Sequence, residues 1–209
     1  MINLITFDLD DTLWDVRPAL IKAEHAQNVW LQQHYPRAIE NRDSHDLNQR
    51  KKDLIKQQPN LIHHISRFRQ IFLEQLLLDA GVPPDEACDA AMQAFGAFIA
   101  RRNDVELFKH AESVLEELNQ DYTLAAITNG NADVSQTPLA AFFSFALKAE
   151  DVGAAKPAPD LFLAAMAQAN SSPEQIVHVG DSHDHDIVGA HGVGIRSVWL
   201  TSEQQPSTL

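Results

Sequence analysis

Three aspartates stand at positions where they can act together. Asp8 and Asp10 directly follow a short apolar run near the start of the chain, and Asp181 follows another such run much later. Carboxylates that pack closely repel one another and resist ionisation unless a cation lies between them. Mg²⁺ suits such a set because it prefers oxygen ligands, is held by one or two carboxylates and accepts an oxygen of a substrate phosphate. These residues therefore predict a Mg²⁺ site.

Groups that can bind a phosphate lie in two further segments. Thr128, Asn129 and Gly130 follow a third apolar run, and Lys156 precedes a proline. The Thr128 hydroxyl and the backbone N–H groups near Asn129 and Gly130 can donate hydrogen bonds to phosphate oxygens, and the Lys156 ammonium adds a positive charge. Lys156 and a metal ion together would supply the positive charge that an acidic chain needs to bind a phosphate ester.

A phosphoryl group neutralised in this way can be attacked by a carboxylate. Such catalysis depends mainly on positioning and electrostatic stabilisation, and a covalent aspartyl-phosphate divides one displacement into two. Asp10 lies two residues after Asp8. Its carboxyl group can therefore protonate the leaving alcohol and later accept a proton from the attacking water.

Short apolar runs are predicted to form the strands that position these groups. Near-continuous apolarity without alternation is typical of strands that are covered on both faces. The runs are residues 2–7, 123–127, 176–179 and 197–200, with a less apolar fifth run at 145–148. Helices are predicted between them at residues 110–119, 158–168 and 184–191. This alternation predicts an α/β fold with a doubly wound parallel sheet, in which ligands bind beyond the carboxyl ends of the strands.

Residues 15–104 follow a different pattern, with no convincing strand and several amphipathic segments. Helices are predicted there at residues 18–33, 61–80 and 85–101. Their apolar stripes consist of Ile62, Ile65, Phe68, Phe72 and Leu76 in the second helix, and of Cys88, Met92, Phe95 and Ile99 in the third. We therefore predict a helical insert at residues 15–104 and a Rossmann-like core at residues 1–14 and 105–209.

The composition narrows the class of partner. The formal net charge is −13, from 29 acidic and 16 basic residues, which disfavours nucleic acid and anionic membranes because either would add to the repulsion. Cys88 is the only cysteine, so a disulfide framework is excluded and a reducing compartment is indicated. No signal peptide is recognisable, and no apolar run reaches the roughly 18 residues of a membrane span. We expect a cytoplasmic monomer or homodimer that acts on a small phosphorylated metabolite.

At these residues the chain resembles the haloacid dehalogenase-like hydrolase superfamily. The motifs of that superfamily occur in its order and span almost the whole chain. They are Asp8-Leu9-Asp10-Asp11-Thr12, Thr128, Lys156-Pro157, and Gly180-Asp181 with Asp186. The resemblance implies that Asp8 is the nucleophile and Asp10 the general acid/base. It also implies that Mg²⁺ is bound by the carboxylates of Asp8 and Asp181 and by the backbone carbonyl of Asp10.

The same resemblance implies roles for the remaining motif residues. Thr128 and Lys156 would bind the phosphate, and Asp186 would support either the metal-bound waters or Lys156. The helical insert resembles the type-1 cap of the family, which closes over the site and selects substrates.

Three stretches narrow the resemblance to a bacterial subgroup. The phrases FDLDDTLWD and ITNGNAD and residues 143–156 are similar to those of phosphatases that include an enzyme of the riboflavin pathway acting on 5-amino-6-(5-phospho-D-ribitylamino)uracil. Flavin mononucleotide, a flavin precursor or a sugar phosphate are the substrates that this resemblance implies.

Two other functions use similar residues. A haloacid dehalogenase shares the fold and the aspartate nucleophile, but the loss of halide needs no proton donor, so Asp10 favours a phosphatase. A receiver-type signalling domain also combines acidic residues, Mg²⁺, a threonine and a lysine. In such domains the acidic residues all precede the threonine, whereas here Asp181 follows Lys156.

Histidines and one tryptophan leave further alternatives open. His178, His183, His185 and His191 suggest zinc, although the spacing of His183 and His185 does not match a helical i, i+4 pair and no cysteine is near. Trp14, directly after the first motif, could line the substrate pocket or fasten the hinge of the insert.

Overall fold

The computed structural model of the chain describes residues 1–40 and 43–201. The chain divides into two compact units, one of residues 1–16 and 106–209 and one of residues 17–105. We call the first the core unit and the second the helical unit. The sequence analysis places the two boundaries after residues 14 and 104, whereas they fall after residues 16 and 105.

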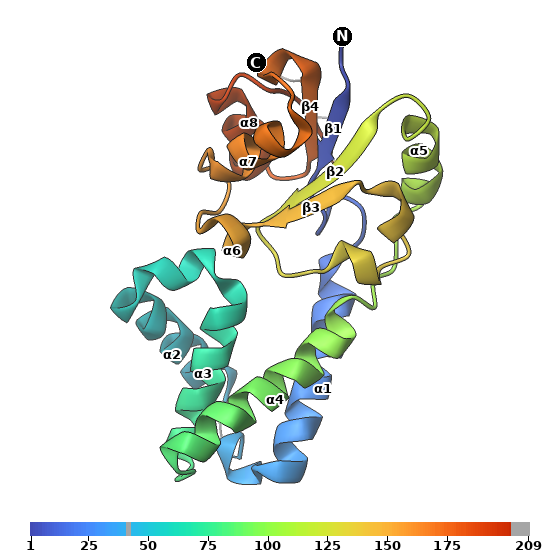
Figure 1. Ribbon diagram of the computed structural model, residues 1–209. Helices are drawn as coiled ribbons and strands as arrows, with labels where there is room; N and C mark the ends of the chain where they lie inside the picture. The colour runs from blue at the N-terminus through green and yellow to red at the C-terminus, as the bar shows by residue number, and fades with distance from the viewer. Residues whose placement is uncertain (41–42, 202–209) are drawn as a thin grey trace. The chain divides into compact units, whose positions relative to one another are not determined.

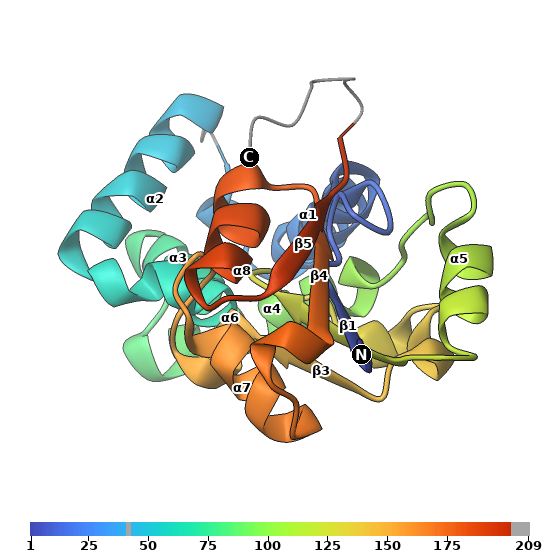
Figure 2. The same cartoon turned by 90° about the horizontal axis from the view of Figure 1, so that it is seen from above.

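The core unit is built on a sheet of five parallel strands in the order β3-β2-β1-β4-β5. The strands are β1 (Leu4–Phe7), β2 (Thr123–Thr128), β3 (Phe145–Lys148), β4 (Ile176–Gly180) and β5 (Arg196–Trp199). Helices α7 and α8 lie on one side of the sheet and α5 lies on the other (Figure 2). The predicted α/β class with a doubly wound parallel sheet is confirmed. The strand order reverses between β1 and β4, which is where such sheets bind ligands.

The helices of the core unit depart from the sequence prediction after β4. Its helices are α5 (Ala111–Leu118), α6 (Ala149–Val152), α7 (Asp160–Ala169) and α8 (Gly189–Gly192), with 3₁₀ turns at Val134–Gln136, Ala140–Phe142 and Pro173–Gln175. The single helix predicted at residues 184–191 is instead a π-helix, His183–Val188, followed by α8. A π-helical turn is frequent at functional sites, because the wider turn changes where its side chains point.

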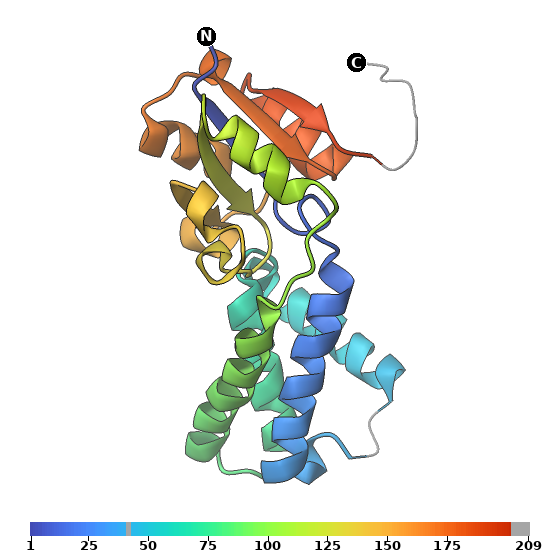
Figure 3. The same cartoon turned by 90° about the vertical axis from the view of Figure 1, so that its right-hand side faces the viewer.

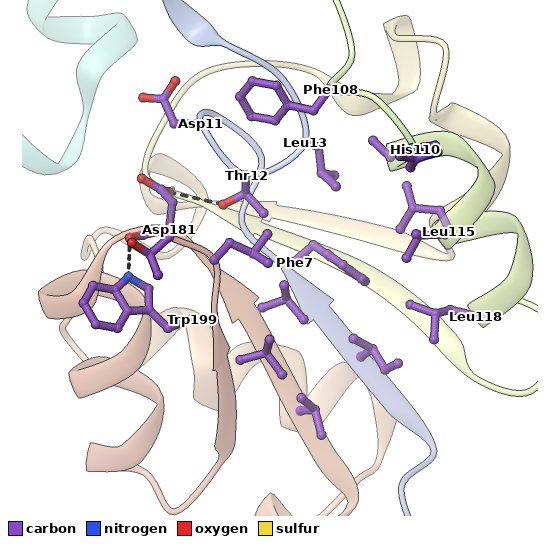
Figure 4. A pocket seen from close by; sticks show the side chains of 18 of the residues that line it. Phe7, Asp11, Thr12, Leu13, Phe108, His110, Leu115, Leu118, Asp181 and Trp199 are labelled. Atoms are coloured by element: carbon purple, nitrogen blue, oxygen red, sulfur yellow. Dashed lines mark hydrogen bonds between the residues drawn. The ribbon is translucent and has the colours of Figure 1, made fainter. Parts of the chain in front are cut away.

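The two faces of the sheet are covered unequally. On the side of α7, a cluster of fully buried side chains that includes Leu4, Ile127 and Phe162 joins helix to sheet. On the side of α5 there is a mainly apolar cavity of about 1010 Å³, into which Phe7 and Leu115 point (Figure 4). The walls of this cavity come from β1, β4, β5 and α5.

The helical unit contains four α-helices among its described residues. They are α1 (Val16–His34), α2 (Ser44–Gln57), α3 (Ile65–Asp79) and α4 (Pro84–Arg102), with 3₁₀ turns at Pro36–Ala38 and Pro59–His63 (Figures 1 and 3). Helix α2 was not predicted because its sequence is mostly polar, and Leu54 is its only residue that is buried. Its start is fixed by Asp43, whose side chain accepts a hydrogen bond from the Asp46 N–H.

The apolar stripes predicted for this unit are partly wrong. On α4, Cys88 and Met92 are exposed. The buried face consists instead of Ala87, Ala90, Ala91, Ala94 and Phe98. These positions follow helical spacing, and the small alanine side chains let α3 and α4 approach closely. Ile62 is also exposed, because it lies in the 3₁₀ turn before α3. In the part of the chain that the structure describes, no helix is long and apolar enough to cross a membrane.

Candidate active site

A cavity of about 190 Å³ opens at the carboxyl ends of β1, β2 and β4. Every site residue predicted from the sequence lines it, namely Asp8, Asp10, Thr128, Asn129, Lys156, Asp181 and Asp186. Asp11, Gly130, Ser182 and His185 complete the walls. The structure therefore brings the predicted motifs together at one edge of the sheet, although they are far apart in the sequence.

The ammonium of Lys156 joins two carboxylates inside this site. Its Nζ donates hydrogen bonds to Asp8 Oδ1 at 2.8 Å, to Asp186 Oδ1 at 2.6 Å and to the Ile127 carbonyl at 2.8 Å. These bonds use all three of its N–H groups. Lys156 and Asp186 are almost fully buried, at 2% and 1% exposure. One positive charge thus faces two negative charges in a region with little water.

The backbone of Lys156 is fixed by Asn129. The Asn129 side chain donates from Nδ2 to the Lys156 carbonyl at 2.9 Å and accepts from the Lys156 N–H at 2.7 Å. The phosphate contact predicted at Asn129 is made by its backbone N–H, and this contact stays a prediction, while the Asn129 side chain holds Lys156. Thr128 Oγ1 accepts a hydrogen bond from the Gly130 N–H at 3.0 Å. As the acceptor in that bond, the hydroxyl retains its own hydrogen for donation.

Asp181 is held by two neighbours on the opposite side of the site (Figure 4). The Thr12 hydroxyl donates to Asp181 Oδ1 at 3.2 Å, and the Trp199 indole N–H donates to the Asp181 carbonyl at 2.8 Å. Both its side chain and its backbone are therefore oriented. The sequence does not predict that Thr12 or Trp199 orients Asp181. Both residues lie far from Asp181 in the sequence or on another strand, and the spacing of the motifs does not show that they meet.

Asp10 is oriented by Trp14. The indole N–H of Trp14 donates to Asp10 Oδ1 at 2.9 Å, and the Trp14 side chain is fully buried. The Trp14 carbonyl also accepts a hydrogen bond from the Asp11 N–H at 2.8 Å. Trp14 is not among the residues that line the site cavity, and its hydrogen bonds hold the loop after β1, while a role at the hinge of the insert stays a prediction.

The charges of the site are strongly perturbed. Burial raises the pKa of Asp8 to about 7, although Lys156 opposes this shift. Burial also raises the pKa of Asp181, and the charge of Asp186 adds to the effect. Asp186 differs: burial alone would raise its pKa, but the His178 hydrogen bond and the Lys156 charge outweigh burial and lower it to about 2. The positive charges of the protein alone therefore do not fully stabilise the ionised carboxylates of Asp8 and Asp181.

A bound cation would stabilise these carboxylates. Carboxylate oxygens of Asp8, Asp181 and Asp186 lie within 4.8 Å of one another. Across residues 1–40 and 43–201, no other cluster of histidine, cysteine and acidic side chains comes this close together. A donor set made only of oxygens suits a hard cation such as Mg²⁺.

The zinc alternative finds no support in the described residues, because the four histidines do not converge. His178 is buried against Asp186, His183 packs edge-on against Trp199, and the Nε2 atom of His191 is 3.1 Å from the hydroxyl oxygen of Ser197. His185 alone of the four lines the site cavity.

The larger cavity beside α5 lacks most of the predicted site residues. It contains neither Asp8 nor Lys156, and of the residues that line the smaller cavity only Asp11 and Asp181 also line it (Figure 4). The predicted catalytic and phosphate-binding residues therefore gather at the smaller, polar cavity.

Comparison with known proteins agrees with this geometry. The family of haloacid dehalogenase-like hydrolases matches residues 2–194. The chain is 33% identical over 202 residues to 5-amino-6-(5-phospho-D-ribitylamino)uracil phosphatase YigB of Escherichia coli (strain K12), covering 97% of this chain and 84% of that protein. It is also 33% identical over 145 residues to phosphoserine phosphatase of Thermus thermophilus, covering 66% of this chain and 57% of that protein.

A solved structure provides a further comparison. The crystal structure of a 2-haloacid dehalogenase from Pseudomonas syringae pv. Tomato DC3000 matches with a TM-score of 0.94 at 40% identity, covering 100% of this chain and 90% of that chain. A match this close supports the arrangement of the sheet and helices described above.

The close approach of Asp186 to β4 generates a prediction. A Cβ atom on Gly180 would overlap the Asp186 carboxylate, whereas one on Gly192 would meet nothing within 4 Å. We expect Gly180→Ala to lower the free energy of unfolding by about 1–3 kcal/mol, and Gly192→Ala to leave it nearly unchanged. Thermal unfolding of the two variants beside the unmodified protein measures the difference, and equal melting temperatures would contradict the predicted overlap.

Proposed function

Because the chain belongs to the haloacid dehalogenase-like hydrolase family, we propose that it is a Mg²⁺-dependent phosphomonoesterase that forms an aspartyl-phosphate on Asp8. The observation that carries this proposal is the meeting of Asp8, Lys156 and Asp181 in one small polar cavity. The names of the relatives YigB and phosphoserine phosphatase support the same reaction class.

The metal would be held by oxygen ligands from two segments of the chain, the loop after β1 and the end of β4. The carboxylates of Asp8 and Asp181 and the backbone carbonyl of Asp10 are the proposed ligands, with Asp186 nearby to hold Lys156. Mg²⁺, when bound, would neutralise phosphate oxygens and help to fix the phosphoryl group for attack. The positive charge of Lys156 would attract the phosphoryl group, and the Thr128 hydroxyl would donate a hydrogen bond to one of its oxygens.

In the first step the Asp8 carboxylate attacks phosphorus. A bond forms between an Asp8 oxygen and phosphorus as the bond between phosphorus and the ester oxygen breaks. Asp10 gives its proton to the leaving alkoxide, which departs as an alcohol. The Trp14 N–H donates to Oδ1 of Asp10 and thereby orients the carboxyl group that transfers the proton.

In the second step water attacks the same phosphorus. Asp10, now a carboxylate, accepts a proton from the water, and the bond between phosphorus and the Asp8 oxygen breaks. Phosphate leaves and the Asp8 carboxylate is restored. The Asn129 clamp on the Lys156 backbone keeps the ammonium in place through both steps, which matters because catalysis of this kind depends on fixed charges.

The size of the cavity supports a phosphate group as the part of the substrate that enters. At about 190 Å³ it is smaller than the roughly 300–1,000 Å³ that pockets for whole small molecules occupy. The organic part of the substrate must therefore lie outside it. The relative YigB is named for a flavin precursor, so we propose a flavin precursor, flavin mononucleotide or a sugar phosphate as the substrate.

Dehalogenation is the second candidate, because a structure 40% identical to this chain is titled a 2-haloacid dehalogenase. Both reactions use an aspartate nucleophile. Loss of halide requires neither a proton donor at Asp10 nor a cluster of carboxylates suited to a cation. The orientation of Asp10 by Trp14 and the close carboxylates of Asp8 and Asp181 therefore favour the phosphatase.

Variants of the two aspartates test the roles assigned to them. Asp8→Asn should abolish phosphate release from p-nitrophenyl phosphate, because the amide is a poor nucleophile. Asp10→Asn should lower kcat by about 10²- to 10⁴-fold, which is the contribution of a general acid/base. Asp184→Asn, at an exposed carboxylate, is the matched control and should keep the activity of the unmodified protein. Full turnover by Asp8→Asn would exclude Asp8 as the nucleophile.

Removal of divalent cations tests the metal assignment. Activity should vanish with EDTA and return on addition of excess Mg²⁺, because the oxygen donor set suits a hard cation. Isothermal calorimetry should show Mg²⁺ binding to the unmodified protein and much weaker binding to Asp181→Asn. Recovery of activity with Zn²⁺ but not with Mg²⁺ would contradict the assignment.

A substrate panel separates the two candidate reactions. It should contain 5-amino-6-(5-phospho-D-ribitylamino)uracil, flavin mononucleotide, sugar phosphates, phosphoserine and 2-chloropropionate. We expect phosphate release from at least one phosphorylated flavin precursor, flavin or sugar and no chloride release. Release of chloride with no release of phosphate from any compound would favour the dehalogenase instead.

A further inference from the structure

His178 lies behind the active-site cavity and touches none of the space within it. It is fully buried on β4 and is not among the residues that line the cavity. Its Nδ1 atom lies 2.9 Å from the Thr6 hydroxyl oxygen, and its Nε2 atom lies 3.1 Å from Asp186 Oδ1. The ring of Phe162 packs edge-on against the imidazole, with the ring centroids 5.2 Å apart. Both ring nitrogens of His178 thus have a hydrogen-bond partner, and the ring of Phe162 packs against the imidazole.

The partners of His178 determine which nitrogen carries the hydrogen. Asp186 Oδ1 also accepts a hydrogen bond from Lys156 Nζ, and an ionised carboxylate can only accept. Nε2 must therefore be the donor toward Asp186. Thr6 can donate its hydroxyl hydrogen, so Nδ1 is the acceptor in the neutral ring. Burial lowers the pKa of His178 to about 4, which agrees with a neutral imidazole.

The result is one directed series of hydrogen bonds. Thr6 donates to His178, and His178 donates to Asp186. Asp186 in turn accepts from Lys156, whose ammonium also reaches Asp8. Thr6 stands directly beside His178 on the neighbouring strand β1 and lies two residues before Asp8. The series therefore begins and ends on the same short strand segment.

We propose that His178 is a positioning residue whose Nε2–H fixes the Asp186 carboxylate and thereby holds the Lys156 ammonium against Asp8. Apart from Lys156 itself, Asp186 accepts a hydrogen bond at Oδ2 from the Ser182 N–H at 3.0 Å, which does not by itself fix Oδ1. His178 supplies the second tie, on the oxygen that Lys156 uses. The role rests on the proposed function, because the position of Lys156 matters to catalysis only if a phosphoryl group binds there.

The geometry of β4 explains why a histidine at position 178 can hold the Asp186 carboxylate. Residues 178 and 180 lie on the same face of β4, because side chains alternate along a strand. At position 180 a glycine leaves room for the Asp186 carboxylate, and at position 178 the imidazole is long enough to reach that carboxylate from behind. Neighbouring positions of one strand thus provide the space and the donor.

Two amide variants separate the donor from the rest of the ring. A glutamine side chain can place its NH₂ group close to where Nε2 lies, whereas an asparagine reaches only as far as Nδ1. We expect His178→Asn to lower kcat with p-nitrophenyl phosphate by about tenfold to hundredfold, the usual effect of removing a buried group that orients a site residue. His178→Gln should recover most of that loss. Equal kcat in His178→Asn and the unmodified protein would overturn the proposal.

A matched control removes packing without removing the donor. Phe162→Leu deletes part of the ring that rests on His178 and should lower the melting temperature, because it leaves a small cavity. Its kcat should stay close to that of the unmodified protein. A similar fall in kcat for Phe162→Leu and His178→Asn at a similar loss of stability would show that His178 acts only through packing.

Nitrogen-15 NMR of the unmodified protein tests the hydrogen-bond direction independently of the effect of any substitution on kcat. The resonance of His178, identified by its absence in His178→Gln, should show a neutral ring with hydrogen on Nε2 at pH 7. Hydrogen on Nδ1, or on both nitrogens, would overturn the proposal. The spectrum does not depend on turnover. An unmodified protein with no phosphatase activity would refute the proposed function, whereas an active protein with the wrong tautomer would refute this inference alone.

Discussion

The buried ammonium of Lys156 is the constraint on which the rest of the site depends. Removing an ammonium from water costs several kcal/mol unless acceptors and opposite charges replace the lost hydration. Lys156 finds three acceptors, two of them carboxylates of Asp8 and Asp186. Each of the three acceptors lies on a different segment of the core unit. The fold must therefore bring three segments to one point, since a missing carboxylate would leave a buried charge without compensation.

The order of the strands meets this requirement. Strand β1 lies in the middle of the sheet with β2 and β4 on its two sides, so the residues that follow all three strands emerge at one edge. The pairing of Phe7 with Val179 sets Asp8 beside the end of β4, and the Asp8 N–H donates to the Val179 carbonyl at 2.9 Å. The backbone of the nucleophile is thereby fixed by the same ladder that holds the sheet together.

The sequence predicts most of this because its strongest signals are local. Short apolar runs identify the strands, and polar residues directly after them identify the edge at which ligands bind. Interactions that arise only from three-dimensional packing were missed. Nothing in the sequence indicates that the Asn129 side chain clamps Lys156 or that Trp14 reaches back to Asp10. The alanine face of α4 was missed because alanine contributes little apolarity, although small side chains are what close packing of helices requires.

The electrostatics of the site explain how an acidic chain can bind a phosphate. The net charge is −13, yet binding depends on the few charges within a small buried volume, where screening by water is weak. There, Asp8 and Asp181 are held close together and the pKa of each is raised. In a protein selected only for stability such repulsion would be removed. A cation bound between Asp8 and Asp181 would relieve this repulsion, and together with Lys156 it would offset the negative charge of an incoming phosphoryl group.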